Sequence, residues 1–149
     1  MESYLKPAAL YGIVMDTEGA RPKKRFEDPS QMIDVGNEYI RMKKYLKAIE
    51  IFELIIDDKP RLTHLAKAYN DCGIAYAELG IYEKAIAHFE EAINLERYLI
   101  DFGARAYRNL GHVYELMGDT EKAKKNFEKA EVIEEDLYHY WVTRCDELE

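Results

Sequence analysis

Aromatic, alanine and glycine residues recur along the chain at fixed spacings. The best copy of this pattern comprises Tyr69, Cys72, Gly73, Tyr76, Gly80, Tyr82, Ala85, Phe89 and Ala92. The copy 38 residues later comprises Tyr107, Leu110, Gly111, Tyr114, Gly118, Thr120, Ala123, Phe127 and Ala130. A weaker copy 37 residues earlier comprises Met32, Val35, Gly36, Tyr39, Lys43, Tyr45, Ala48, Phe52 and Ile55. Agreement at so many offsets in three copies predicts an internal repeat.

Each copy has the spacing of two helices joined by a turn. The expected helices are 29–42 and 45–58, then 62–79 and 82–98, then 103–117 and 120–134. Asp28 before Pro29 is typical of a helix start, and Asp119 or Thr120 can cap a later helix. Gly80 and Gly118 fit helix C-termini. Long alternations of β-branched residues are absent from the sequence, so we expect no sheet.

The segments outside the three copies are less regular. Residues 136–149 place Leu137, Tyr140, Trp141, Cys145 and Leu148 on roughly one helical face. This pattern predicts a capping helix, or a continuation of the helix before it. Residues 1–28 mix helix breakers with apolar residues, so they form an arm packed on the repeats, a free or partner-binding tail, or an arm lying in the protein's own groove. The basic run "RPKKR" in this arm is too short to indicate a nucleic-acid site.

The recurring residues resemble the signature of the tetratricopeptide repeat (TPR), a helix-turn-helix unit. The resemblance covers about residues 29–133 and implies an all-α fold. We therefore expect an α-solenoid of three TPR repeats in a right-handed superhelix with a C-terminal capping helix. The family repeat is 34 residues long, whereas the spacings here are 37 and 38. The extra residues fall between units, so we expect longer helices at the junctions, as in long-repeat members of the family.

The resemblance implies a division of the chain and a role for its signature residues. The expected segments are an N-terminal arm at 1–28, repeats at 29–65, 66–103 and 104–135, and the capping helix at 136–149. The glycines Gly36, Gly73 and Gly111 are expected to let two helices approach, with alanines facing them and phenylalanines filling the space between units. Cys72 stands where the family carries a buried apolar residue.

The family binds peptides on the concave side, which the first helix of each unit lines. The candidate groove residues on these helices are Asn37, Arg41, Lys67, Asn70, Ile74, Arg105, Arg108 and His112. Arg105, Arg108 and His112 stand at i, i+3 and i+7, and arginine pairs with carboxylates in a bidentate way. The sequence therefore predicts a site for an acidic peptide or a chain's C-terminal carboxylate. The alternative is that the cluster pairs with the surrounding Glu and Asp residues or is simply solvated.

Some family members hold chaperone tails with a carboxylate clamp of two Asn, two Lys and an Arg. Asn37 matches this clamp, and Arg105 replaces a lysine conservatively. The remaining positions hold Ile33, Asp71 and Asn109, and Asp71 would repel a carboxylate. We therefore do not expect binding of chaperone tails.

Charge and composition narrow the function classes. The formal net charge is −8, so a nucleic-acid partner is not expected. No apolar run reaches the ~20 residues that span a bilayer, and the first 30 residues lack a signal-peptide pattern, so we expect a cytoplasmic protein with no membrane partner. The two cysteines and four histidines form no metal, redox or nucleophile motif. We expect neither enzyme activity nor a cofactor.

Together these patterns predict a protein-interaction scaffold or adaptor. It would bind a protein or a peptide, including an acidic one, in its concave groove. Two alternatives stay open: a self-associating structural module that forms homo-oligomers, and a regulatory subunit of a larger enzyme or secretion complex.

Overall fold

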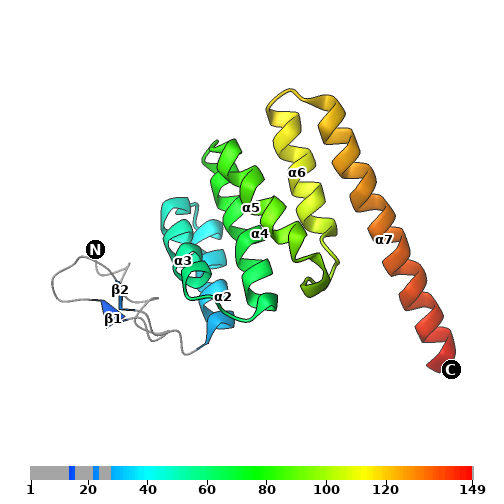
Figure 1. Ribbon diagram of the computed structural model, residues 1–149, viewed down its shortest axis with the longest axis horizontal. Helices are drawn as coiled ribbons and strands as arrows, with labels where there is room; N and C mark the ends of the chain where they lie inside the picture. Colours follow the sequence, from blue (N-terminus) through cyan, green and yellow to red (C-terminus); the bar gives the residue numbers. More distant parts are fainter. Residues whose placement is uncertain (1–13, 16–21, 24–27, 149) are drawn as a thin grey trace.

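Three pairs of antiparallel helices stand side by side in a row (Figure 1). The computed structural model describes residues 14–15, 22–23 and 28–148. The helices are α2 (Pro29–Arg41), α3 (Tyr45–Asp57), α4 (Leu62–Glu78), α5 (Tyr82–Asn94), α6 (Ala104–Leu116) and α7 (Thr120–Leu148). Each pair is one repeat unit, and the three units form a short right-handed α-solenoid. The predicted all-α repeat fold is confirmed.

The turn inside each unit has the same backbone structure. In the second unit the N–H of Gly80 donates to the Ala77 carbonyl at 2.9 Å, and the N–H of Ile81 donates to the Tyr76 carbonyl at 3.0 Å. These two bonds define a Schellman C-cap, which needs a left-handed residue. Gly80 has a φ of +75°, and Gly118 provides the same conformation in the third unit. In the first unit Lys43 takes this place with a φ of +59°.

The predicted helix starts are confirmed at two places. The Asp28 side chain accepts a hydrogen bond from the Ser30 N–H at 2.9 Å, with Pro29 in the first turn of α2. Asp119 accepts one from the Lys122 N–H at 3.1 Å at the start of α7. Each bond satisfies one of the backbone donors that a helix start leaves without an intrahelical partner.

The glycine at the centre of each first helix packs against a phenylalanine of the second helix. A Cβ placed on Gly73 would lie 2.7 Å from the Phe89 ring, which is closer than carbon atoms approach. Gly36 and Gly111 meet Phe52 and Phe127 in the same way. The partner of each glycine is thus a ring inside its own unit, rather than only the alanine that the sequence suggested.

The two junctions between units use their extra residues differently. At the first, α4 begins at Leu62 and has 17 residues, so the predicted long helix is confirmed. At the second, the expected helix 82–98 is wrong: α5 ends at Asn94, and the short 3-10 helix η1 (Glu96–Tyr98) follows. The chain then turns through Gly103, at a φ of +85°, and the Asp101 carboxylate accepts the N–H groups of Gly103 and Arg105. These bonds satisfy backbone N–H groups at the start of α6, so α6 begins after a turn and not as a continuation of α5.

The C-terminal segment continues the helix before it. Helix α7 runs unbroken over 29 residues, so the second of the two alternatives for residues 136–149 is correct. The first half of α7 packs on α6, and its second half extends beyond the rest of the row (Figure 1).

One short strand pair departs from the expectation of no sheet. Strands β1 (Val14–Met15) and β2 (Pro22–Lys23) are antiparallel, with Val14 opposite Lys23. The expectation relied on long alternating patterns, which a two-residue strand cannot carry. The rest of the N-terminal arm, and so the choice between its three predicted states, lies outside the described residues.

Candidate functional site

The first helices of the three units form one face, which we call the inner face. Helix α4 contacts both α2 and α6 on this face. Polar side chains connect the three helices: Asn37 Nδ2 donates to Asp71 Oδ2 at 3.0 Å, and Asn109 Nδ2 donates to Asn70 Oδ1 at 3.3 Å. Asn70 Nδ2 also donates to Asp71 Oδ1 at 3.4 Å. One line of amide and carboxylate groups therefore runs from α2 across α4 to α6.

Asp71 is the centre of this line and is an unusual residue to bury. Its exposed fraction is 5 %, as is that of Asn70. Burial raises the pKa of the Asp71 carboxyl, while the hydrogen bond from Asn37, the positive charge of Lys67, the hydrogen bond from Asn70 and the positive charge of Arg105 lower it. Burial is the largest of these effects, so the pKa stays above its ordinary value.

Lys67 and Arg105 are the two cations that act on this carboxylate. Lys67 lies four residues before Asp71 on α4, so both side chains share one helical face. Arg105 stands at the same distance before Asn109 on α6. Neither cation makes an ion pair within residues 28–148. The charges of both cations therefore lower the pKa of one buried acid, although burial raises it by more.

Three other candidate residues are placed differently. Arg108 turns to α7 and forms a bidentate pair with Glu134, with Nη2 2.7 Å from Oε2 and Nε 3.3 Å from Oε1. His112 packs edge-on against the Phe127 ring and lies 3.5 Å from Glu115. Arg41 pairs with Glu38 at 2.7 Å on the surface. The alternative in which these residues pair with neighbouring acids describes all three.

The remaining candidates, Asn37, Asn70 and Ile74, are buried or partly buried and contact other residues of the protein. Asn37 and Asn70 both lie in the polar line, but Asn70 is buried by its neighbours. Ile74 is partly buried and packs against the core. Ile33, at one of the clamp positions, is 1 % exposed and so belongs to the core.

Sequence reasoning treated Asp71 and Asn109 only as departures from a clamp and missed that they hold the inner face together. A signal was present, because each stands two residues before its unit's glycine, and Asp34 takes that place in the first unit. Asp34 is exposed, since no described helix packs on α2 from the other side, so this offset marks a contact between first helices only in the second and third units.

His, Cys, Asp and Glu side chains are the groups that could support metal or nucleophile chemistry. The described residues contain no group of three or more of these side chains placed to hold a metal ion. Burial, with the charges of Glu53 and Asp71, raises the pKa of the Cys72 thiol to about 12, so this buried thiol is not a nucleophile near neutral pH. Among the same residues, none of the helices has the length and apolar character to cross a bilayer.

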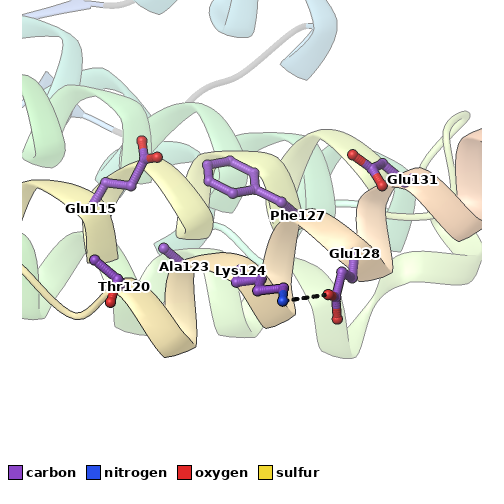
Figure 2. A pocket seen from close by; sticks show the side chains of 7 residues that line it. All are labelled: Glu115, Thr120, Ala123, Lys124, Phe127, Glu128 and Glu131. Carbon is purple, nitrogen blue, oxygen red and sulfur yellow. Dashed lines mark ion pairs between the residues drawn. The ribbon is translucent and has the colours of Figure 1, made fainter.

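A surface hollow lies at the open end of the third unit (Figure 2). It has a volume of about 340 Å³ and is lined by residues of α7 and by Glu115 near the end of α6. The Phe127 ring and Ala123 lie along it, and its lining includes Glu115, Glu128 and Glu131. A second hollow of about 360 Å³ follows along α7, lined by Glu131, Glu134, Glu135 and Tyr138. Lys124 also lines the first hollow and lies 3.9 Å from Glu128, so the two hollows together carry more acidic than basic side chains.

Comparison with known proteins agrees with this architecture. The family model described as the tetratricopeptide repeat matches residues 66–98 and again residues 104–137. No curated protein matches the chain by sequence. Among solved structures, the crystal structure of MamA is similar with a TM-score of 0.65 and 27 % identity, over 76 % of this chain and 62 % of MamA. The chain thus spans less than two thirds of that relative.

Two more distant structures share the fold. The TPR domain of Arabidopsis FLU has a TM-score of 0.64 and 20 % identity, over 72 % of this chain and 95 % of that domain. The second TPR of Spaghetti (RPAP3), solved bound to the HSP90 peptide SRMEEVD, has a TM-score of 0.62 and 20 % identity, over 89 % of this chain and 99 % of that one. Repeat signature, helical pairing and these likenesses agree, and residues 66–98 and 104–137 are tetratricopeptide repeats.

Proposed function

We propose that the chain is a non-catalytic protein-interaction module that binds an acidic peptide segment of a partner protein on its inner face. The observation that carries the proposal is the placement of Lys67 and Arg105. Both cations act on one buried carboxylate, and neither has an ion-pair partner within residues 28–148. A peptide carboxylate would supply the partner that both lack.

The polar line next to these cations suits a preformed binding surface. Asn37, Asn70, Asp71 and Asn109 hold one another in place, so α2, α4 and α6 keep a fixed spacing before any ligand arrives. A surface that is already ordered loses less conformational entropy on binding. The guanidinium of Arg105 offers a planar pair of donors that matches a carboxylate.

A related fold supports the choice of ligand class. The RPAP3 domain was solved with SRMEEVD, a peptide with three acidic side chains. Its identity to this chain is 20 %, so it supports a shared fold and the plausibility of peptide binding, not a shared ligand. The chaperone tail itself is not proposed here, since Ile33, Asp71 and Asn109 replace the clamp residues.

The test compares two double charge reversals. Lys67→Glu with Arg105→Glu removes the proposed site, while Arg97→Glu with Lys125→Glu makes the same change of net charge on η1 and α7. Each chain is immobilised and exposed to a display library of random peptides, and the retained sequences are read. We expect the wild type and the control to enrich peptides rich in Asp and Glu, and the site variant to lose this enrichment.

The choice of Lys67 in place of Arg108 matters for this test. Reversing Arg108 would set a new acidic group against Glu134 and weaken the contact of α6 with α7. Circular dichroism should show the same helix content for both double variants and the wild type. Equal enrichment of acidic peptides by the site variant would place the binding site elsewhere and overturn the proposal.

A further inference from the structure

The second half of α7 exposes large apolar side chains, and the ring contacts of its aromatic residues are with neighbours on the same helix. We call residues 135–148 the α7 tail. Its exposed apolar residues are Tyr138, Tyr140, Trp141, Val142 and Leu148. Trp141 is the single tryptophan of the chain and is 60 % exposed. Such a density of exposed apolar side chains on one helical segment favours an interaction site.

The α7 tail carries four acidic side chains and one basic one, and the two helical turns before it are also acidic. The sequence from residue 128 to residue 149 carries eight acidic and two basic side chains, which accounts for six of the eight net negative charges. Glu135 and Asp136 make no ion pair within residues 28–148. Glu135 lines a hollow with Glu131, Glu134 and Tyr138, so acid and aromatic groups lie together. The complementary partner is a basic segment with an apolar side chain.

The chain itself contains such a segment. Residues 21–26 read "RPKKRF", with four basic side chains followed directly by Phe26. By contrast, two α7 tails packed on each other would bring acidic side chains together, and these repel one another most strongly at low ionic strength. Charge complementarity therefore favours the basic segment over a tail-to-tail contact.

The short connection to α2 disfavours a contact within one molecule for Lys24 and Arg25, the basic residues nearest to α2. Lys24 and Arg25 precede Asp28 by four and three residues, so they lie within about 14 Å of it even in an extended chain. Helix α2 and helix α7 stand at opposite ends of the row, separated by α4 and α6 (Figure 1). Packed helices lie about 8–10 Å apart, so three such steps exceed that reach.

We propose that residues 21–26 of one copy of this chain bind the acidic, aromatic α7 tail of a second copy. The contact joins two different surfaces, so each copy keeps one free segment and one free tail. Such a heterologous contact builds a ring or an open head-to-tail filament.

The test measures assembly by sedimentation velocity at 50 mM salt over a range of protein concentrations. One variant carries Lys23→Glu with Lys24→Glu, and the other carries Glu135→Lys with Asp136→Lys. We expect the wild type to associate, each variant to need about tenfold higher concentration or more, and high salt to dissociate the wild type.

The decisive experiment mixes the two variants. Each assembles poorly alone, but the acidic tail of the first can accept the basic segment of the second, and the reversed pair also matches. We expect the equimolar mixture to form assemblies that contain both. Lys67→Glu with Arg105→Glu should assemble like the wild type, so a failure of the inner-face proposal leaves this result unchanged.

Trp141 reports the contact directly. A peptide of residues 17–28 should shift its fluorescence emission to shorter wavelength and saturate, and the same peptide with Glu at positions 23 and 24 should not. A wild type that stays monomeric, an assembly indifferent to both reversals, or a mixture that fails to assemble would each overturn the proposal. Peptide binding to Trp141 without assembly of the intact chain would also overturn it, and would indicate a foreign basic partner.

Discussion

The phenylalanine that packs on the unit glycine is covered to different extents in the three units. Phe52 is fully buried and Phe89 is 1 % exposed, whereas Phe127 is only partly buried and borders a hollow (Figure 2). The three rings meet their glycines in the same way, so the contact within the unit does not explain the difference. The first two units have a following unit beside them, and the third has none among the described residues.

This comparison separates the core contacts that form within one unit from those that need the next unit. The contact of glycine with phenylalanine comes from within one unit, and the next unit supplies the remaining cover. Stability in such arrays is a sum of unit terms and nearest-neighbour terms. The third unit lacks one neighbour term, so the same substitution should have different effects at an inner unit and at the open end.

The largest expected effect compares two truncations. Phe89→Ala should lower the free energy of unfolding by about 3–5 kcal/mol, because it leaves a cavity in a closed core. Phe127→Ala should lower it by roughly 1–2 kcal/mol, because that ring is already partly in contact with water. Urea denaturation followed by circular dichroism measures both. Equal losses would show that the open end is covered in solution.

The next comparison adds a methyl group instead of removing a ring. Gly73→Ala should destabilise by about 1–2 kcal/mol, since overpacking outweighs the gain of about 1 kcal/mol in helix propensity. Gly111→Ala should be close to neutral, because Phe127 can move toward its hollow. The same denaturation experiment applies. A large loss at Gly111 would mean that the Phe127 ring is held as firmly as Phe89.

A smaller effect is expected at the turns, which the three units share. Lys43 holds a left-handed conformation that costs an L-residue about 1–2 kcal/mol. Glycine avoids this strain but loses more backbone entropy on folding, which cancels part of the gain. Lys43→Gly should therefore raise the melting temperature and stabilise by roughly 0.5–1 kcal/mol. Gly80→Lys is the matched reverse change and should destabilise by a similar amount. Stabilisation by both would rule out the backbone explanation.

The smallest effect concerns the polar line that crosses the contacts between units. The pKa of Asp71 is raised in the folded state, so its ionised form weakens folding at neutral pH. As the pH falls from the raised pKa of the folded state toward the ordinary value of 3.8, Asp71 is protonated in the folded protein before it is protonated in the unfolded chain. Relative to Asp71→Asn, the wild type should gain stability over this window. Parallel stability profiles for the two proteins from pH 7 to pH 4 would contradict the shift.

Much of the fold follows from the sequence because its information is local. The three turns, the Asp28 and Asp119 caps and the helical pairing depend on residues a few positions apart, and each was predicted from such spacing. The end of α5 was not, because it depends on Asp101 and Gly103 capping the next helix. The extent of α7 was left open between two alternatives, since an apolar stripe looks the same in a packed helix and in a projecting one.

The candidate site was less predictable than the fold. The spacing of Arg105, Arg108 and His112 puts them on one side of a helix, but that side borders both α4 and α7. Which neighbour a side chain meets depends on the placement of Glu134 and Phe127, which lie 26 and 15 residues away from Arg108 and His112, respectively. The burial of Asp71 likewise depends on three helices together.

The unbroken helix α7 sets a fixed distance between the α7 tail and the rest of the protein. Its 29 residues span about 44 Å at the rise of an α-helix, more than twice the length of the 13-residue α6 against which it is anchored. A single helix held over its first half keeps the direction of its second half. Whatever binds the tail is therefore presented at a set distance and orientation from whatever binds α2, α4 and α6, which favours a partner or assembly whose own sites match that spacing.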